Sequence, residues 1–300
     1  MFRIIHLTDP HIGPLPPAAF SQLMGKRITG WFNWKRGRQR IHDMTIMSAI
    51  LDDMALQPVD HIACTGDICN LGLPGEWPAA RKYLETLGTP ERVSYVPGNH
   101  DAYVRGSLEG LLQACKPYML GDGSDTISFP YLRRRGKIAL IGLSSAIPTP
   151  PFKAYGALGS EQLQKLENLL LELSRDSDCI RVILIHHPPY IGGASARRGL
   201  NDAEGFEKVV SRAGAELVLF GHNHISSLVY FKGPRGPVPI VGAPSVSADH
   251  DEIRRRAAYH FFHIDMDGKT LKIGMESRGR LEDGSVGQLG FTTILPQSAS

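Results

Sequence analysis

Seven side chains of the types that coordinate metal ions fall in five short blocks of the sequence. The blocks are Asp9-x-His11, Asp67, Asn99, His186 and His222-x-His224. In D-x-H and H-x-H the two side chains are two residues apart, so in an extended segment they point the same way and can reach a common centre. This mixture of carboxylate, amide and imidazole groups suits Mn²⁺, Fe²⁺ or Zn²⁺ better than Ca²⁺, which prefers oxygen ligands alone.

Seven groups are more than one tetrahedral shell needs. If Asp67 is shared between two cations, each cation receives about four protein ligands, and a bridging hydroxide fits at a metal separation of roughly 3.5 to 4 Å. Such a pair lowers the pKa of a bound water, holds the hydroxide in line with phosphorus and neutralises charge on the phosphate oxygens. The blocks therefore predict a site for two divalent metal ions that hydrolyses a phosphoester.

Each block ends a short apolar run with the length and β-branched content of a buried strand. These runs with their blocks are 2–11, 59–67, 92–101, 179–189 and 215–224, and helix-like stretches lie between them at 42–57, 75–88, 160–176 and 201–214. Alternating strands and helices favour an α/β architecture with much parallel sheet. Because such sheets place functional residues beyond the carboxyl ends of their strands, we expect the five blocks to converge.

Three further segments complete the predicted domain. We expect a strand at 137–146 and a hairpin near the C-terminus, in which 259–265 and 270–277 flank a turn at Met266-Asp267-Gly268-Lys269. Residues 281–300 are rich in Gly, Ser and Gln and are predicted to be a peripheral tail. A chain of 300 residues with 42% hydrophobic composition can bury one large core, so we predict a single domain over 1–280 with an insertion at about 20–40.

Taken in order, the blocks resemble the calcineurin-like metallophosphoesterase superfamily, whose pattern is D-x-H, G-D, G-N-H-D, H-x-P and G-H-x-H. Every block is intact here, and the match runs over residues 9–224. The resemblance implies a four-layer αββα sandwich of two mixed β-sheets flanked by helices. It also implies that His186 rather than His187 is a ligand, and it divides the ligands into one set of Asp9, His11, Asp67 and His224 and another of Asp67, Asn99, His186 and His222.

His100 is the catalytic candidate. It stands beside Asn99 and is not among the implied ligands, so we expect it to contact the phosphate and to protonate the leaving alkoxide. Relatives that resemble the protein phosphatases carry Asp where this chain has Asn70, and there it orients the acid histidine. Asn70 cannot stabilise an imidazolium by charge, so His100 is expected to use Asp101 or a backbone carbonyl instead. Asn70, Asp101 and His187 are predicted to support the site without binding metal.

The segment 20–40, FSQLMGKRITGWFNWKRGRQR, is unusually aromatic and basic. Three interpretations stay open. It is a helical flap packed on the domain, a lid that closes on a nucleotide or other phosphate substrate, or a membrane-surface contact that points to a lipid-linked substrate. The residues expected to act in a lid are Trp31, Trp34, Lys35 and Arg36.

The composition excludes several other classes. The formal net charge of +3 gives no strong nucleic-acid signal. The N-terminus has no signal-peptide pattern and no apolar run could span a bilayer, so a cytoplasmic protein, or one peripheral at the inner membrane, is expected. Four cysteines without a C-x-x-C pair predict neither disulfides nor structural zinc. We interpret the histidines outside the blocks as packing or surface residues: His6, His42, His61, His260 and His263.

The leading prediction is hydrolysis of a small phosphodiester substrate, with a cyclic nucleotide as the candidate, because the short form of the pattern resembles bacterial class III cyclic-nucleotide phosphodiesterases. That resemblance also suggests a homodimer. The alternative is a membrane-associated pyrophosphohydrolase of a lipid precursor such as an acylated UDP-sugar. A second alternative is a non-catalytic scaffold on the same fold, which loss of a ligand or of His100 would have favoured.

Overall fold

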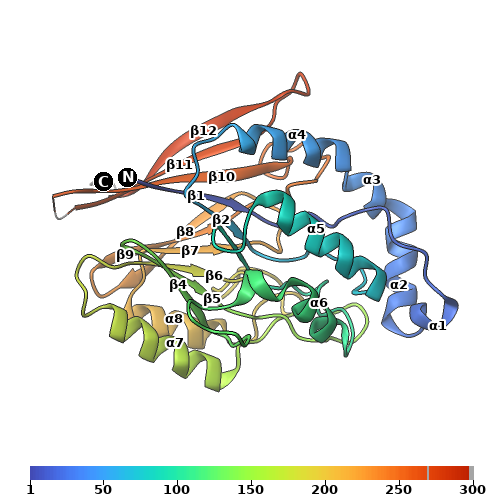
Figure 1. The fold of residues 1–300 in the computed structure, drawn as a ribbon, viewed down its shortest axis with the longest axis horizontal. Coiled ribbons are helices and arrows are strands. Elements are labelled where there is room, and N and C mark those ends of the chain that lie inside the picture. Colours follow the sequence, from blue (N-terminus) through green and yellow to red (C-terminus); the bar gives the residue numbers. More distant parts are fainter. Residues whose placement is uncertain (269, 297–300) are drawn as a thin grey trace.

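Two β-sheets lie face to face in the computed structural model, and helices cover their outer surfaces (Figure 1). The structure describes residues 1–268 and 270–296. The predicted four-layer arrangement of two mixed sheets flanked by helices is confirmed.

The first sheet has the strand order β12-β11-β10-β1-β2-β3. Its N-terminal strands are parallel to one another, whereas the C-terminal strands add to β1 in antiparallel fashion. The bounds are β1 (Phe2–Leu7), β2 (His61–Cys64), β3 (Val93–Tyr95), β10 (Ala258–Asp267), β11 (Thr270–Arg280) and β12 (Val286–Leu295).

The second sheet has the order β4-β5-β6-β7-β9-β8, with a parallel centre and an antiparallel strand at each edge. The bounds are β4 (Tyr131–Arg135), β5 (Ile138–Gly142), β6 (Ile180–Leu184), β7 (Leu217–Phe220), β8 (Ser227–Gly233) and β9 (Gly236–Gly242). In both sheets the carboxyl ends of the parallel strands face the end of the molecule where α1, α2 and α3 lie (Figure 1).

The larger helices are α4 (Met44–Ala55), α5 (Trp77–Leu87), α6 (Ser107–Cys115), α7 (Gly159–Leu173) and α8 (Ala203–Ala213), with short 3₁₀ turns η2 (Pro74–Glu76) and η3 (Lys116–Met119). Four of them, α4, α5, α7 and α8, fall close to their predicted places, whereas α6 was not predicted. The segment after β1 folds as α1 (Phe20–Leu23), α2 (Lys26–Asn33), a π-helical turn η1 (Trp34–Arg38) and α3 (Gln39–Ile41).

Successive side chains along the strands of the second sheet point to opposite faces, so the sheet contributes to two hydrophobic cores. Leu140, Val182 and Leu219 face the first sheet and belong to the large central cluster. Their neighbours Ile141 and Ile183 point the other way and pack against α7 and α8. Because these strands are buried on both faces, their sequences read as continuous apolar runs, which is typical of parallel sheet between layers.

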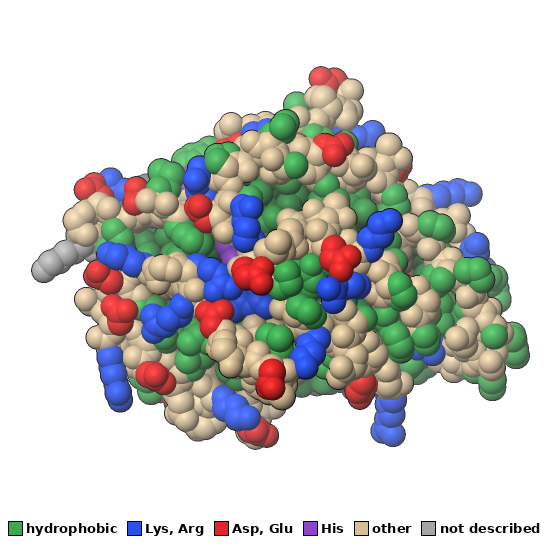
Figure 2. Space-filling view, in the orientation of Figure 1, with side chains coloured by type: hydrophobic (Ala, Val, Ile, Leu, Met, Phe, Trp, Pro, Cys, Tyr) green, Lys and Arg blue, Asp and Glu red, His purple; other side chains and the backbone are tan. Residues whose placement is uncertain are grey.

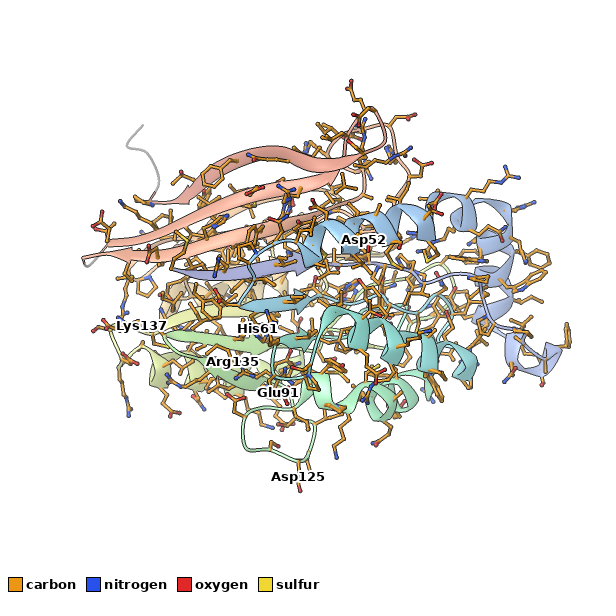
Figure 3. All side chains as sticks on the ribbon, turned by 45° about the horizontal axis from the view of Figure 1, so that its top comes forward. Asp52, His61, Glu91, Asp125, Arg135 and Lys137 are labelled. Carbon is orange, nitrogen blue, oxygen red and sulfur yellow. The ribbon has the colours of Figure 1, made fainter. Side chains whose placement is uncertain are left out.

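The amino ends of the parallel strands lie at the opposite end of the molecule from α1–α3. His61 begins β2 there, near Arg135 (Figure 3), and its Nε2 lies 2.8 Å from the Ser94 hydroxyl. His6 and His260 are likewise buried and hydrogen-bonded, as expected of packing residues. His42 is buried and lies 2.9 Å from the Ser247 hydroxyl, but it also stands with His11 and His224 in a group that could hold a metal ion, its ring 4.4 Å from that of His11.

The C-terminal region differs from expectation in one respect. The predicted hairpin is confirmed as β10 and β11, with Asp267 paired to Thr270, and Lys269 of the predicted turn lies outside the described residues. Within the segment expected to be a peripheral tail, Val286–Leu295 forms β12 at the edge of the first sheet, with Ile294 and Leu295 buried. The Gly, Gln and Thr content of this segment does not predict a strand, which forms by pairing with β11. Residues 297–300 lie outside the described part of the chain.

Candidate metal centre

The five predicted blocks follow β1, β2, β3, β6 and β7 and meet at one end of the two sheets. Parallel pairing of β1, β2 and β3 in one sheet, and of β6 and β7 in the other, brings their carboxyl ends to the same side. All seven predicted ligand side chains come together there: Asp9, His11, Asp67, Asn99, His186, His222 and His224.

One group of these side chains surrounds Asp9. The Nε2 of His224 lies 3.0 Å from Asp9 Oδ1 and 3.3 Å from the Nε2 of His11. The other carboxylate oxygen of Asp9 accepts from the Thr8 hydroxyl at 2.7 Å and from the backbone N–H of His222 at 2.9 Å. Asp9 and His11 are fully buried, so their side chains have one orientation open to them.

A second group surrounds Asn99. Its Oδ1 lies 2.8 Å from Nδ1 of His222 and 3.2 Å from Nε2 of His186. The orientation of the His186 ring is fixed by a hydrogen bond from its Nδ1 to the carbonyl oxygen of Thr65, at 2.6 Å. This leaves Nε2 of His186 facing the carboxylate of Asp67 at 3.3 Å.

Asp67 lies between the two groups. Its Oδ2 is 3.3 Å from His186 on one side and 3.9 Å from Nε2 of His11 on the other. The Nε2 of His222 is buried and has no hydrogen-bond partner in the part of the chain that the structure describes. The other ring nitrogen, Nδ1, is the one that faces Asn99 Oδ1. Asp67, His186 and His222 offer ligand atoms within 4.8 Å of one another, and this mixed set of carboxylate, amide and imidazole groups fits two divalent cations.

The backbone of the ligand loops is strained. The left-handed region, which only Gly enters freely, is occupied by five residues of the ligand set, with φ values of 53° at Asp9, 43° at His11, 54° at Asp67, 67° at His222 and 52° at His224. Each such residue costs on the order of 1–3 kcal/mol and persists only where the surroundings hold it in place. The strain therefore marks these loops as shaped for a site.

Asp101 holds the loop of Asp67. Its carboxylate accepts from the backbone N–H groups of Asp67, Cys69 and Gly98 at 2.7–3.0 Å and from the Tyr95 hydroxyl at 2.6 Å. Burial, with the nearby charge of Asp67, raises the pKa of Asp101 to about 6. Among the described residues, the hydrogen bonds of the Asp101 carboxylate go to the loop backbone and Tyr95 and not to the ring of His100, so Asp101 acts on the site through the loop.

His100 takes its orientation from a backbone carbonyl, one of the two predicted alternatives. Its Nδ1 lies 2.6 Å from the carbonyl oxygen of Asn70, while the side chain of Asn70 donates to the carbonyl of Ile12. The other ring nitrogen, Nε2, accepts from Arg38 Nη1 at 2.9 Å. Burial and the positive charge of Arg38 lower the pKa of His100 to about 3, against a smaller opposing effect of Asp67.

The opposite charges in the centre stabilise one another. Burial alone would raise the pKa of Asp67, but His186 and His100 hold it well below its ordinary value. Burial alone would lower the pKa of His186, yet Asp67 raises it to about 9. His187 lies behind this pair, fixed by the Ser145 hydroxyl at 2.7 Å and by the carbonyl of Ala154 at 3.1 Å, with its ring 4.5 Å from that of His222.

The predicted lid residues divide between two surfaces of the α2–η1 segment. Trp34 is buried, with its ring stacked 6.3 Å from that of His42, and Trp31 packs against the small cluster around Leu71. Trp34 lines the cavity beside the metal ligands, whereas Lys35 and Arg36 are exposed and are not among its lining residues, and a lid role for these residues stays a prediction. The π-helical turn directs Arg38 toward the centre.

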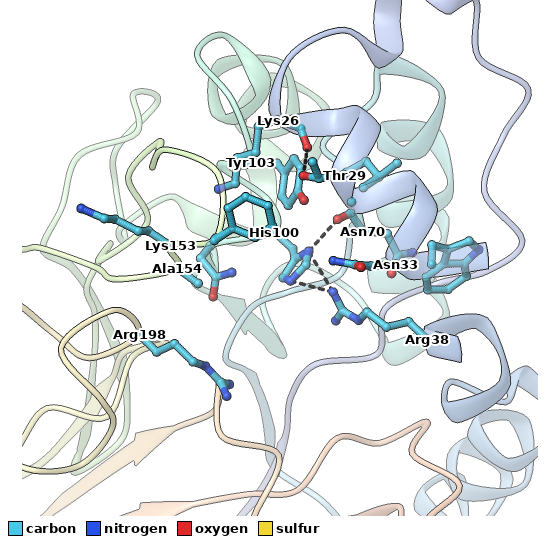
Figure 4. A pocket seen from close by; sticks show the side chains of 15 residues that line it. Lys26, Thr29, Asn33, Arg38, Asn70, His100, Tyr103, Lys153, Ala154 and Arg198 are labelled. Carbon is cyan, nitrogen blue, oxygen red and sulfur yellow. Dashed lines mark hydrogen bonds between the residues drawn. The ribbon is translucent and has the colours of Figure 1, made fainter. Parts of the chain in front are cut away.

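A cavity of about 210 Å³ lies between this segment and the ligand loops (Figure 4). Lys26, Arg38, Lys153 and Arg198 supply its charged lining, and none of its lining residues is acidic. His100 lies in its wall beside Tyr103, whose ring is 5.4 Å away. The cavity thus joins the proposed acid to a strongly positive surface that suits an anionic substrate.

Sequence reasoning missed all four cations of the cavity as parts of the site. Lys26 and Arg38 are two of several cations in a basic segment, and Lys153 and Arg198 stand in loops without a recognisable motif. The crowding of Lys and Arg in 20–40 was a signal for the segment, but no spacing rule singled out Arg38, because its position depends on the π-helical turn.

The comparisons with known proteins agree with this geometry. The family model described as calcineurin-like phosphoesterase matches residues 2–226, and the chain belongs to that family. A protein of Synechococcus named as a probable cyclic nucleotide phosphodiesterase is 26% identical over 226 residues, which cover 74% of this chain and 78% of that protein. A protein of Enterobacter lignolyticus named as a glycerophosphodiester phosphodiesterase is 27% identical over 176 residues, covering 58% of this chain and 59% of its own length.

Solved structures show the same fold. A dimetal phosphatase from Danio rerio aligns over 97% of this chain and 99% of its own, with a TM-score of 0.59 and 16% identity. The prediction of a metal-dependent phosphoric ester hydrolase is confirmed by the family. In the described residues, no helix is long and apolar enough to cross a membrane.

Proposed function

We propose that this chain is a phosphodiesterase whose two divalent cations are held by Asp9, His11, Asp67, Asn99, His186, His222 and His224. The observation that carries the proposal is the position of Asp67, fully enclosed between two groups of imidazole and oxygen ligands. When bound, the cations would activate water and neutralise phosphate charge, and Mn²⁺, Fe²⁺ or Zn²⁺ suits the mixed ligands.

The protein's own residues do the remaining work. Thr8 and the N–H of His222 fix the carboxylate of Asp9, and Thr65 fixes the ring of His186, so the ligand atoms need not reorganise during the reaction. His100, anchored through Nδ1 to Asn70, turns Nε2 toward Arg38 and the cavity. When the substrate phosphate takes over the bonds of Arg38, Nε2 is free to take up a proton from solvent and to pass it to the leaving oxygen. Asn70, Asp101 and His187 hold these groups in place.

The substrate proposed first is a cyclic nucleotide, supported by the name of the Synechococcus relative. The test is Mn²⁺-dependent turnover of bis(p-nitrophenyl) phosphate and of 3′,5′- and 2′,3′-cyclic AMP by the wild type and by Asp67→Asn. We expect turnover by the wild type and none by the variant, with both proteins folded by circular dichroism. A folded, metal-loaded wild type that hydrolyses none of these and no other phosphoester would favour the scaffold alternative.

A second candidate is hydrolysis of a lipid-linked precursor at a membrane surface. It is favoured by exposed apolar side chains over α1 and α2, where Phe20, Met24 and Phe32 are 75%, 65% and 54% exposed (Figure 2). Lys35 and Arg36 are exposed in the π-helical turn that follows α2, and their charge would complement anionic lipid headgroups. Flotation with vesicles containing phosphatidylglycerol tests this: Phe20→Ser with Phe32→Ser should abolish co-flotation, and equal flotation of the variant would contradict it. A cytoplasmic location and a homodimer stay predictions.

A further inference from the structure

One large aromatic side chain at the edge of the cavity stays exposed to water. Phe152 lies in the loop between β5 and α7, lines the cavity beside the metal ligands and is 78% exposed. Single exposed hydrophobic side chains are common on protein surfaces, so exposure alone does not mark a site. It does show that burial of this ring contributes little to the stability of the fold.

The backbone at Phe152 is strained as well. Its φ is 63°, in the left-handed region, and the N–H of Lys153 donates to the carbonyl of Pro150 at 3.2 Å, which makes Phe152 the third residue of a tight turn. Gly usually fills that position when φ is positive. Within residues 1–268 and 270–296, the other non-glycine residues with positive φ are all proposed metal ligands: Asp9, His11, Asp67, His222 and His224. Such strain gathers at functional sites, and neither burial nor backbone preference explains a phenylalanine here.

The loop of Phe152 is anchored on both sides of the cavity. The Thr149 hydroxyl accepts from Nζ of Lys26 in α2 at 2.7 Å. The carbonyl of Ala154, which lies in the cavity wall (Figure 4), accepts from Nε2 of His187 at 3.1 Å, and the His187 ring packs beside that of a proposed ligand. The backbone of Phe152 therefore has a set position relative to the metal centre, and a substrate that meets it need not order the loop first.

The rest of the cavity lining limits what the Phe152 ring can meet. The lining is mostly polar or charged, and its apolar members Trp34 and Leu71 are buried in the protein. A long acyl chain would therefore find little apolar surface beside the phosphate. A planar ring needs only one face to stack on, and an exposed phenyl ring supplies it. Because a phenyl ring has no hydrogen-bonding atom, it favours a base without distinguishing one base from another.

We propose that Phe152 is a specificity-determining residue that stacks on the nucleobase of a nucleotide phosphodiester. This inference rests on the proposed two-metal function and adds to it the group that recognises the organic part of the substrate. The phosphate lies at the metal centre beside His100 and Arg38, and the base extends from it toward the loop of Phe152. A small polar alcohol such as glycerol has no planar face and gains nothing from this contact.

The first test compares kcat/KM for two esters with the same leaving group, thymidine 5′-monophosphate p-nitrophenyl ester and methyl p-nitrophenyl phosphate, in the presence of Mn²⁺. Phe152→Ala should lower kcat/KM for the nucleoside ester roughly five- to a hundredfold, as for the loss of one base stack, and should change the methyl ester little. Phe291→Ala is the matched control, because Phe291 is 56% exposed on β12 and is not among the lining residues. It should resemble the wild type on both esters.

Two conservative variants distinguish stacking from a general apolar contact. Phe152→Trp should keep the preference for the nucleoside ester, and Phe152→Leu should lose most of it. Full activity of Phe152→Leu would replace the base by an aliphatic group such as an acyl chain and overturn the inference. Equal losses on both esters would also overturn it and leave the two-metal function intact. No Mn²⁺-dependent turnover of either ester by the folded wild type would overturn the proposed function itself.

Phe152→Gly separates a ring kept for function from one kept for folding. Gly relieves the left-handed backbone, and little buried surface is lost, so Tm should rise by roughly 2 °C. The preference for the nucleoside ester should nevertheless fall as far as in Phe152→Ala. A lower Tm with an unchanged preference would assign Phe152 to folding and overturn the inference.

A binding measurement tests the stacking independently of turnover. Adenosine 5′-monophosphate and ribose 5-phosphate share the sugar and the phosphate and differ in the base. Calorimetry with the Mn²⁺-loaded wild type should show roughly tenfold tighter binding of the nucleotide, and Phe152→Ala should remove the difference while Phe291→Ala keeps it. Equal affinity of the wild type for the two compounds would contradict a stacked base.

Discussion

The ligand loops and the α1–α3 segment lie against each other across one cavity, yet they are built in different ways. The loops after β1, β2, β3, β6 and β7 are buried, hold strained backbone and bond to one another through networks such as that of Asp101. The α1–α3 segment is a chain of short helices with much exposed surface, attached through a few side chains including Trp34 and Arg27.

We infer from this difference that the ligand loops carry out the hydrolysis and that the α1–α3 segment influences which substrate is chosen. Strained, enclosed loops hold ligand atoms in fixed places, as hydrolysis by two metal ions requires. A helical segment on the surface can change its side chains at little cost to the fold, because few buried contacts depend on them. We therefore expect substitutions in the loops to affect turnover of every phosphoester, and substitutions in α1–α3 to change which phosphoester is preferred.

Among the substitutions that test a single step, the largest loss of kcat is expected for His100→Gln, which removes the proposed general acid and leaves the metal ligands intact. Loss of a general acid should lower kcat by roughly 10²–10⁴-fold for a substrate with a poor leaving group. The loss should shrink for bis(p-nitrophenyl) phosphate, because p-nitrophenolate leaves without a proton. Steady-state kinetics on the two kinds of ester measure this, and an equal loss on both would contradict a proton-transfer role.

Asp101→Asn should weaken metal binding without removing a ligand. The amide can no longer accept from three backbone N–H groups and the Tyr95 hydroxyl as a carboxylate does, so the loop of Asp67 should loosen. We expect a loss of roughly 10–100-fold in Mn²⁺ affinity, as for other groups that orient ligands. Titration calorimetry measures it; unchanged affinity would show that Asp101 is not needed to position Asp67.

The ligand loops are easier to predict from the sequence than the α1–α3 segment. Asp9, His11 and the other ligands stand at short fixed spacings after apolar strands, so local sequence suffices to predict both their chemistry and their convergence. The alternation of strand and helix patterns was enough to predict an α/β architecture, whereas the sandwich of two mixed sheets followed from the family resemblance. Strand β12 was not predicted from the sequence. Its composition does not favour a strand, and it forms one by pairing with β11.

The position of Arg38 could not be read from the sequence. It depends on the π-helical turn and on the burial of Trp34, and both are results of tertiary packing. The partner of His100 was narrowed to two alternatives, and only the course of the backbone at Asn70 decided between them. The sequence therefore predicted the candidate metal ligands, but it did not identify the residues, such as Arg38, that line the cavity beside them.

Gly30→Leu tests the independence of the two regions. Gly30 is buried where α2 meets Tyr103, and a Cβ there would lie 2.6 Å from Leu71 Cδ2, so a larger side chain must push α2 away. We expect about a tenfold loss of kcat/KM for a cyclic nucleotide, with Mn²⁺ binding unchanged. Loss of metal binding in the folded variant would mean that the segment and the loops form one unit.

The smallest effect is expected far from the site, at the contact of α4 with β11. Arg278 donates to the carboxylate of Asp53 at 2.7 Å, and this hydrogen bond, against the effect of burial, lowers the pKa of Asp53 below its ordinary 3.8. A lowered carboxyl pKa adds stability above the ordinary pKa, which is lost as the pH falls through the folded value. Asp53→Asn should cost about 1–3 kcal/mol at pH 7.

Denaturant unfolding of wild type and Asp53→Asn at several pH values checks the sign. The difference between the two free energies of unfolding should shrink as the pH falls below 3.8. Turnover of the variant at pH 7 should equal that of the wild type, since neither partner lines the cavity. A difference in stability that grows in acid would contradict this account.

Anomalous diffraction from crystals grown with Mn²⁺ tests the central claim most directly. We expect two peaks roughly 3.5–4 Å apart, one beside Asp9, His11 and His224, the other beside Asn99, His186 and His222, with Asp67 between them. A single peak, or two peaks that do not share Asp67, would contradict the proposed two-metal centre.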